Sequence, residues 1–295
     1  MDIDYKERKS YFVHRFKQKF DGVICPGFHI LSWAHRCTLE PKCSYCFLNL
    51  TFRYEKKPTV YTNIDKIFKE VKIWLDETKT PSVLNTGELS DSFMIPNNKM
   101  LADLMNLFEM QSKHKLLFLT KNNKIPIEIE NNIYSKQYKQ TIFSFSVNSQ
   151  TAAELYEKGA PGPFDRIATA YRIKKQGQHL RVRVDPILCI DDYKEEYKNV
   201  ISVLNDFLQP ERITLGSLRF FKNLPNFTED KDVFKYGMDH SDGDGRLRLP
   251  LEKRVEIYQW FINNLQCSDV TLCKETLSCY KLINKDITNK CNCTI

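Results

Sequence analysis

Short apolar runs alternate with longer segments of helical period between about residues 24 and 216. In the longer segments, apolar residues recur every three or four positions and charged residues lie opposite them. This alternation is typical of parallel strands joined by crossover helices. Strands are predicted over residues 23–33, 82–85, 115–119, 141–147, 180–188 and 212–215.

The same pattern predicts the helices and the class of fold. Six strands with about five crossovers are too few to close an eight-stranded barrel. We therefore predict an α/β fold, a partial (β/α)6 barrel of parallel strands, with active-site residues at the carboxyl ends of the strands. The clearest helices are predicted over residues 64–77, 99–111, 192–208 and 251–265, and weaker ones follow residues 121 and 165.

The barrel is predicted to carry an extension at each end. Residues 1–23 form an N-terminal extension, residues 24–220 the barrel, and residues 221–295 a cysteine-rich C-terminal extension with a second metal site. A chain of 295 residues with 42% hydrophobic residues can bury one sizeable core.

The composition of the chain indicates its cellular location and its possible binding partners. No apolar run is long enough to span a membrane and the first residues are charged, so we expect a cytoplasmic protein with no membrane partner. A net charge of +7 is compatible with DNA or a nucleotide as substrate, but the lysines are scattered along the chain.

The ten cysteines indicate metal chemistry rather than a disulfide framework, because a reducing compartment keeps thiols free. Cys37, Cys43 and Cys46 lie on one loop after the first predicted strand. Three thiolates can hold three irons of a [4Fe-4S] cluster and leave the fourth iron open to another ligand. Zinc is the alternative, but tetrahedral zinc needs four ligands and only His35 could join them locally.

An open iron can bind the amino and carboxylate groups of S-adenosylmethionine and cleave this cofactor reductively to a 5′-deoxyadenosyl radical. Such an enzyme needs an electron donor such as flavodoxin or ferredoxin. The three-cysteine loop followed by an aromatic residue resembles the hallmark of the radical S-adenosylmethionine superfamily, although the first spacing is five residues where three is usual.

The resemblance extends to the spore photoproduct lyase branch over about residues 24–220. Matching segments occur in the family's order and at predicted strand ends. They are SYCFL in the cluster loop, GELSDS after the second strand, FLTK after the third, FSFSVNS in the fourth and VRVDPI in the fifth.

This resemblance implies a set of S-adenosylmethionine contacts, which suit a zwitterion that needs both a carboxylate and a cation. Ser90 and Asp91 are expected to contact the methionyl part, and Lys121 and Ser146 to bind its polar groups. Asn148 and Asp185 are further expected contacts. For each of them the alternative is a polar residue that caps a helix or a turn.

Two positions depart from the family. Glu88 stands where photoproduct lyases have the cysteine that returns a hydrogen atom to the thymine radical, and Phe47 replaces a tyrosine, although Tyr45 is present two positions earlier. A carboxylate cannot donate a hydrogen atom to a carbon radical. Glu88 instead resembles the glycine-glutamate motif with which other radical enzymes bind the methionyl ammonium, and we assign catalytic roles to Tyr45 and Glu88. Cys189, near the end of the fifth strand, is a candidate hydrogen donor.

The tail offers a second set of thiols, namely Cys273, Cys279, Cys291 and Cys293, with Cys267 as a substitute. Four thiolates suit an auxiliary iron-sulfur cluster or a structural zinc, either of which would stabilise a short tail.

The sequence therefore predicts a radical S-adenosylmethionine enzyme that acts on a thymine lesion or a base in DNA, as a lyase or in DNA repair. One alternative keeps the radical chemistry and changes the substrate to a peptide or small metabolite. The other is a zinc-binding, nucleic-acid-interacting module without catalysis.

Overall fold

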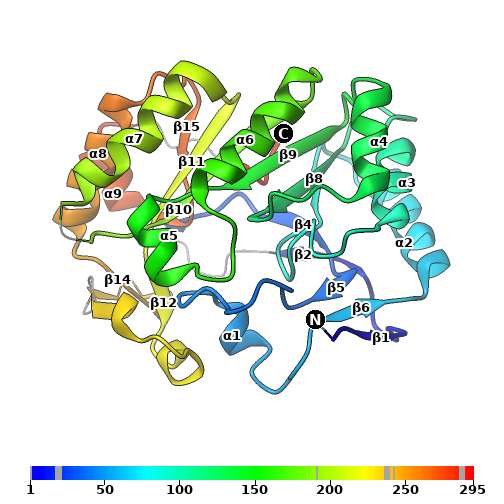
Figure 1. The fold of residues 1–295 in the computed structure, drawn as a ribbon, viewed down its shortest axis with the longest axis horizontal. Helices are drawn as coiled ribbons and strands as arrows, with labels where there is room; N and C mark the ends of the chain where they lie inside the picture. The colour runs from blue at the N-terminus through cyan, green and yellow to red at the C-terminus, as the bar shows by residue number, and fades with distance from the viewer. Residues whose placement is uncertain (1, 17–21, 191, 236–239, 242, 286–289) are drawn as a thin grey trace.

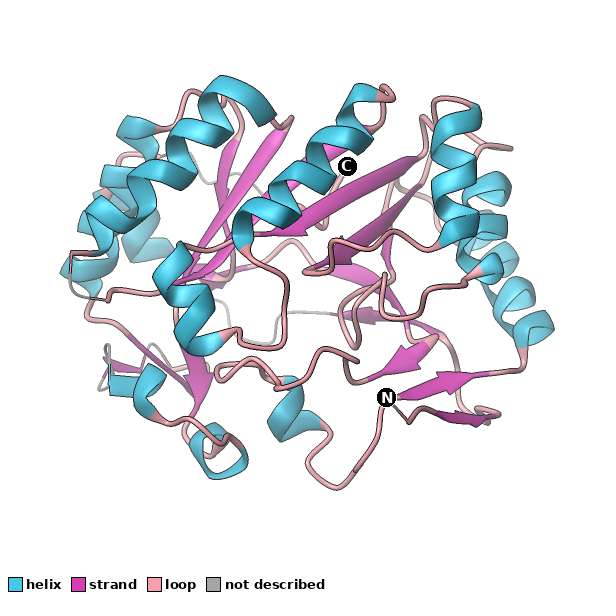
Figure 2. Ribbon diagram, in the orientation of Figure 1, coloured by secondary structure: helices cyan, strands magenta, loops and turns pink. Residues whose placement is uncertain are grey.

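An open barrel of strands surrounded by helices forms the body of the molecule (Figures 1 and 2). The computed structural model describes residues 2–16, 22–190, 192–235, 240–241, 243–285 and 290–295. Parts of the two predicted extensions, residues 17–21, 236–239, 242 and 286–289, therefore lie outside the described residues.

Within the described residues, the main sheet has eight strands, and seven of them are parallel and adjacent in chain order. β2 (Val13–Phe16) pairs antiparallel with the first of these at one edge. The parallel strands are β4 (Phe28–Leu31), β7 (Val83–Asn85), β8 (Lys115–Thr120), β9 (Thr141–Ser146), β10 (His179–Ile187), β11 (Arg212–Ser217) and β15 (Val270–Leu272).

All six predicted strands are confirmed, and the predicted α/β partial barrel is confirmed with them. The sheet is larger than predicted because each extension adds a strand, β2 before the barrel and β15 after it. The predicted domain boundaries at residues 23 and 220 stay a prediction. The N-terminal and C-terminal extensions nevertheless each contribute a strand to the main sheet.

Helices cover the outside of the sheet, as Figure 1 shows for α2, α3, α4, α6, α7 and α8. Among the described residues, none of the helices is long and apolar enough to cross a membrane. The helices are α1 (Leu48–Thr51), α2 (Ile64–Glu77), α3 (Lys99–Phe108), α4 (Ile127–Ser135), α5 (Gln150–Tyr156), α6 (Pro163–Lys175), α7 (Tyr193–Val203), which continues into a π-helical turn η1 (Leu204–Leu208), α8 (Leu251–Asn264) and α9 (Leu277–Leu282), with short 3₁₀ turns η2 (Leu224–Phe227) and η3 (Asp232–Lys235).

Three small sheets surround the barrel. One of them, β3 (Val23–Ile24) paired antiparallel with β16 (Glu275–Thr276), joins the segment before the first parallel strand to the segment after the last. This pair links the two sides of the open barrel. The others are β1 (Asp4–Lys6), β6 (Thr59–Tyr61) and β5 (Ala34–His35), and β12 (Arg219–Phe221), β14 (Arg246–Arg248) and β13 (His240–Ser241).

Local sequence explains where helices begin and which side chains face the lumen of the barrel. The Asn98 side chain accepts a hydrogen bond from the Leu101 N–H and starts α3, and Ser149 starts α5 in the same way. Alternate residues of each strand point to opposite faces. Leu117 therefore packs in the cluster that lines the lumen, whereas Phe118 packs in the larger core beneath the helices.

The last residues of the chain close one end of the lumen. The Asn292 amide donates to Ser144 Oγ and to the Val182 carbonyl, both at 2.8 Å, and its Oδ1 accepts from Thr214 Oγ1 at 2.8 Å. Asn292 is fully buried, and its partners lie on three neighbouring strands. The end of the chain is thus part of the barrel interior.

We expect Asn292→Ala to lower the free energy of unfolding by about 2–3 kcal/mol, because it leaves buried strand groups without a partner. Chemical denaturation measures this change. The exposed Asn264→Ala is the matched control and should change stability by less than about 0.5 kcal/mol. Equal effects of the two substitutions would show that the chain end does not contribute to the barrel.

Candidate active site

The predicted cluster loop lies between β5 and α1 and is fixed by backbone hydrogen bonds. The Cys46 N–H donates to the Cys43 carbonyl at 3.1 Å, and the Ser44 N–H donates to the Tyr156 carbonyl at 2.9 Å. Lys42 Nζ donates to the Cys37 carbonyl at 2.7 Å. All three cysteines are free and partly buried, so their sulfurs are available to a metal.

The electrostatics of the loop fit an iron-sulfur cluster. Burial raises the pKa of Cys43 to about 12, and the Lys121 ammonium opposes that rise. Burial also raises the pKa of Cys37 and Cys46, and the Cys37 thiol is close enough to the other two to be influenced by their charge. Three neighbouring thiols beside a fixed cation suit an anionic thiolate set on iron. Their ligation of the cluster stays a prediction.

The loop packs against a glycine that tolerates no side chain. A β-carbon at Gly159 would lie 2.3 Å from the Glu40 carbonyl carbon and 2.3 Å from the Pro41 carbonyl oxygen. Contacts this short are forbidden to real side chains. Gly159 therefore lets the segment after α5 support the cluster loop at backbone distance.

A buried charged network lies directly behind the loop. Glu157 is 1% exposed, and its carboxylate lies 2.8 Å from Lys121 Nζ and 2.6 Å from Arg166 Nη2. Tyr45 donates its hydroxyl to the same carboxylate. Burial alone would raise the pKa of Glu157, but Lys121 and Arg166 outweigh it and hold that pKa well below its ordinary value.

This network changes the interpretation of three predicted residues. Tyr45 and Lys121 bond to each other as well as to Glu157. Asn148 donates to Glu157 at 3.1 Å and accepts from Tyr197, so its amide is already occupied within the protein. A lysine has three N–H donors, which leaves one for a ligand at Lys121.

The segment after β7 carries Glu88, Ser90 and Asp91. The Asp91 carboxylate accepts from Thr120 Oγ1 and the Lys121 N–H, both at 2.7 Å, so it ties the end of β7 to the end of β8. The Ser90 hydroxyl is buried and has no hydrogen-bond partner among the described residues, which leaves it open to a ligand. Direct contact of either residue with S-adenosylmethionine stays a prediction.

Strand β10 supplies a second charged pair. Asp185 makes two hydrogen bonds of 2.9 Å with the Arg219 guanidinium. Burial would raise the pKa of Asp185, but Arg219 and Arg183 lower it to about 2. Arg183 points to the same face as Asp185 because the two residues are two positions apart on the strand.

These groups surround a pocket of about 740 Å³ that opens beside the cluster loop. Most of the predicted site residues are brought together here. Those that line the pocket are Tyr45, Cys46, Glu88, Lys121, Ser146, Asp185, Cys273, Cys291 and Cys293, and those outside its lining are Cys37, Cys43, Ser90, Asp91, Asn148 and Cys279.

The predicted four-cysteine set in the tail needs a correction. Cys279 lies on α9 in the main core, fully buried, whereas Cys273, Cys291 and Cys293 line the pocket. Within the described residues, no three His, Cys, Asp or Glu side chains are placed to hold a single metal ion. Cys279 therefore lies apart from the other three cysteines, and a metal site in the tail stays a prediction.

Three residues of the site were not assigned to it from the sequence: Glu157, Arg166 and Arg183. Arg183 could have been found, because it lies between Val182 and Val184 and two positions before Asp185, on the same face of the predicted strand. Glu157 gives no such signal, because it lies at the end of an ordinary amphipathic helix.

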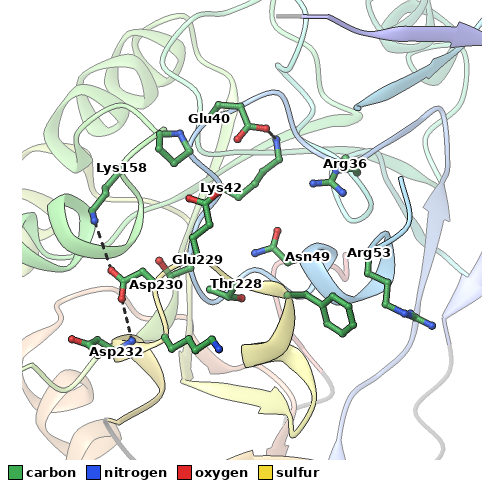
Figure 3. Close-up of a pocket in the computed structure, with 14 residues that line it drawn as sticks. Arg36, Glu40, Lys42, Asn49, Arg53, Lys158, Thr228, Glu229, Asp230 and Asp232 are labelled. Carbon is green, nitrogen blue, oxygen red and sulfur yellow. Dashed lines mark hydrogen bonds and ion pairs between the residues drawn. The ribbon is translucent and has the colours of Figure 1, made fainter. Parts of the chain in front are cut away.

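A second cavity, of about 910 Å³, lies on the outer side of the cluster loop (Figure 3). Figure 3 shows Glu40 beside Lys42 and Lys158 beside Asp230, from the loop, the segment after α5 and the segment after η2. Its charged groups neutralise one another and it is open to solvent, so the inner pocket is the better candidate for chemistry.

Comparison with known families gives one match over most of the chain. The family model described as spore photoproduct lyase matches residues 5–229. Among curated relatives, the spore photoproduct lyase of Geobacillus sp. (strain Y412MC61) is 25% identical over 262 residues, covering 87% of this chain and 72% of the relative. That of Clostridium acetobutylicum is 23% identical over 241 residues, covering 76% and 69%.

Solved structures agree in fold. A spore photoproduct lyase complexed with dinucleoside spore photoproduct aligns with a TM-score of 0.68 at 20% identity, over 83% of this chain and 75% of that one. A mutant spore photoproduct lyase with bound AdoMet and dinucleoside spore photoproduct gives a TM-score of 0.72 at 19% identity, over 92% and 81%.

We expect Gly159→Ala to lower the iron content of the anaerobically reconstituted protein by at least half, because the added methyl group displaces the cluster loop. Iron and sulfide assays measure the loss. Gly162→Ala is the control, since a β-carbon there meets its nearest neighbour at 3.4 Å. Full iron content in both variants would contradict the assigned packing.

We expect Glu157→Gln to destabilise the protein by about 3 kcal/mol at neutral pH, because two buried cations lose their counter-charge. The folded-state pKa of Glu157 lies below its unfolded value of about 4.3, so its contribution is present above that pH and is lost as the pH falls. The stability difference between wild type and variant should therefore shrink in acid.

Denaturation curves at several pH values test this dependence. The exposed Glu154→Gln on the same helix is the matched control and should differ from wild type by less than about 0.5 kcal/mol at every pH. A difference that stays constant down to strongly acid pH would rule out the ion pair as its cause.

Proposed function

The chain belongs to the spore photoproduct lyase family and is a radical S-adenosylmethionine enzyme, and we propose that it acts on a thymine-derived lesion or base in DNA. The supporting observation is that the cluster loop opens on the same pocket as Glu88, in the segment after β7, and the charged residues of β10. Because the chain belongs to a family of radical enzymes, the alternative of a non-catalytic zinc module is dropped.

The residues present fit the cofactors of that class. Cys37, Cys43 and Cys46 would hold the [4Fe-4S] cluster, and Glu88 and Lys121 would take the ammonium and the carboxylate of S-adenosylmethionine. Together the two cofactors supply a 5′-deoxyadenosyl radical when bound and reduced. A flavodoxin or ferredoxin is the proposed reductant.

The rim of the pocket suits a nucleobase. Phe221 is 40% exposed, and the Arg246 guanidinium lies 4.8 Å from the centre of its ring. Phe220 also lines the pocket but is buried against Phe234. An exposed aromatic ring can stack against a base that has been turned out of a duplex, and a neighbouring cation can bind a phosphate.

Glu88 favours a second candidate, in which a peptide or small metabolite replaces the DNA lesion. A carboxylate at this position cannot return hydrogen to a thymine radical as a thiol can. Incubation with reductant, S-adenosylmethionine and dinucleoside spore photoproduct separates the two candidates. Conversion to thymine supports the first, and 5′-deoxyadenosine without loss of the dinucleoside supports the second.

We expect Cys43→Ala to abolish formation of 5′-deoxyadenosine and to lower the iron content well below the four irons per chain expected of wild type. Chromatography of the nucleosides and an iron assay on anaerobically purified protein measure both effects. Cys267→Ala, outside the pocket lining, should leave both unchanged. Undiminished cofactor cleavage in Cys43→Ala would contradict the role of the cluster loop.

A further inference from the structure

The pocket contains a pair of thiols that the proposed reaction has not used. Cys291 and Cys293 come from the last residues of the chain, are 5% and 4% exposed, and both line the pocket. A substrate radical must gain a hydrogen atom to become a stable product, and an S–H bond is weaker than the alcohol O–H and aliphatic C–H bonds of side chains. A phenolic O–H bond is of similar strength, but the hydroxyl of Tyr45, which also lines the pocket, is donated to Glu157. Any pocket thiol is therefore a candidate source.

Cys293 lies beside Glu88. The Asn85 amide nitrogen is 3.5 Å from Glu88 Oε2 and 3.8 Å from Cys293 Sγ, so the carboxylate and the sulfur share one neighbour. Arg183 Nη2 lies 3.1 Å from the same sulfur. The tail thus places a sulfur next to Glu88, whose carboxylate, in the segment after β7, can only accept hydrogen bonds.

The position of this sulfur is fixed by the strands around it. Its neighbour Asn292 is bound to β9, β10 and β11, as described above. Arg181 donates to the Asn292 carbonyl at 3.1 Å and Arg212 donates to the Cys291 carbonyl at 2.8 Å, so both residues that precede Cys293 are bound to strands. The backbone that leads into Cys293 is therefore tied to β9, β10 and β11.

The other cysteines suit this task less well, and all ten lie within the described residues. Cys189 packs at the edge of the main core and lies outside the pocket lining, as do Cys267 and Cys279. Cys273 and Cys25 do line the pocket. However, no hydrogen bond in the described residues joins either sulfur to Asn85 or Glu88, whereas Cys293 shares Asn85 with Glu88.

We propose that Cys293, supplied by the end of the chain, is the hydrogen-atom donor to the substrate radical. In this step the S–H bond of Cys293 breaks homolytically and a C–H bond forms on the substrate. The unpaired electron stays on the sulfur, next to Cys291, so no further oxidant or reductant is needed. This inference rests on the proposed function, since it needs a substrate radical in the pocket.

The first experiment is a single turnover in D₂O, in which thiols carry exchangeable deuterium. Wild type with dinucleoside spore photoproduct should give thymine product containing one solvent deuterium. Cys293→Ala and Cys293→Ser should still form 5′-deoxyadenosine and consume the dinucleoside, with the yield of deuterated product at least tenfold lower. The serine variant keeps a polar group beside Asn85 and guards against misfolding of the alanine variant.

Matched controls identify the sulfur. Cys189→Ala should retain the wild-type yield and deuterium content. Unchanged deuterated product in both Cys293 variants overturns the proposal, as does loss of product in Cys291→Ala with retention in Cys293→Ala. Eight irons per chain bound through the tail cysteines would also overturn it, because a thiolate on iron carries no hydrogen.

A second experiment separates failure of this inference from failure of the proposed substrate. Without substrate, the wild-type enzyme in D₂O should place solvent deuterium in 5′-deoxyadenosine, and Cys293→Ala should place at least tenfold less. If wild type leaves the dinucleoside intact, this experiment without substrate decides whether Cys293 is the donor. Equal deuterium labelling of 5′-deoxyadenosine in both proteins then overturns the donor assignment.

A third measurement needs no turnover. Iodoacetamide treatment of the native protein, with peptide mass spectrometry, should modify Cys293 at least tenfold faster than Cys279, because only Cys293 of the two faces the pocket. Equal or slower modification of Cys293 would show that its sulfur is not accessible from the pocket, and would overturn the proposal.

Discussion

The buried carboxylate of Glu157 is the interaction on which the geometry of the site depends. It bonds to Tyr45 of the cluster loop, Lys121 at the end of β8 and Arg166 of α6. Burying charged groups costs free energy unless they satisfy one another. The network can therefore form only when loop, sheet and helix are all in place, and this requirement couples the position of the cluster loop to the assembly of the barrel.

The same short segment supports the loop in two further ways. Its backbone accepts the Ser44 N–H at Tyr156, and its glycine at 159 allows the backbone at Glu40 and Pro41 to approach. Three independent contacts thus converge on residues 156–159, between α5 and α6. A loop that must expose three sulfurs gains little from packing its own side chains, so its order comes from this outside support.

Hydrophobic periodicity was sufficient to predict the fold because each crossover helix and each interior strand must bury its apolar residues. The helix over residues 64–77 was predicted with the observed bounds for that reason. Strand β15 was missed because three residues, VTL, are too short a run to show a period. The antiparallel edge strand β2 was missed because its VHRF mixes charged and apolar residues, as sheet edges allow.

Site residues could be predicted where the chemistry requires a particular residue type. They could not be predicted where their place in the site depends on how distant segments pack together. Three cysteines on one loop predicted the cluster ligands and the superfamily, and the comparisons confirm the family. The sequence grouped Cys279 with the other tail cysteines, but helix α9 turns it into the core. Spacing along a tail cannot show which sulfurs face a lumen, because that depends on how Asn292 and its neighbours bind the strands.

The C-terminal residues inside the lumen bring a second side chain next to Glu88. One side chain there cannot be both a carboxylate that binds an ammonium group and a thiol that donates hydrogen. A tail that enters the lumen brings a second side chain to the same place, since Asn85 contacts both Glu88 and Cys293. The two tasks can then be carried by two residues, with the strands that hold Asn292 fixing the distance between them.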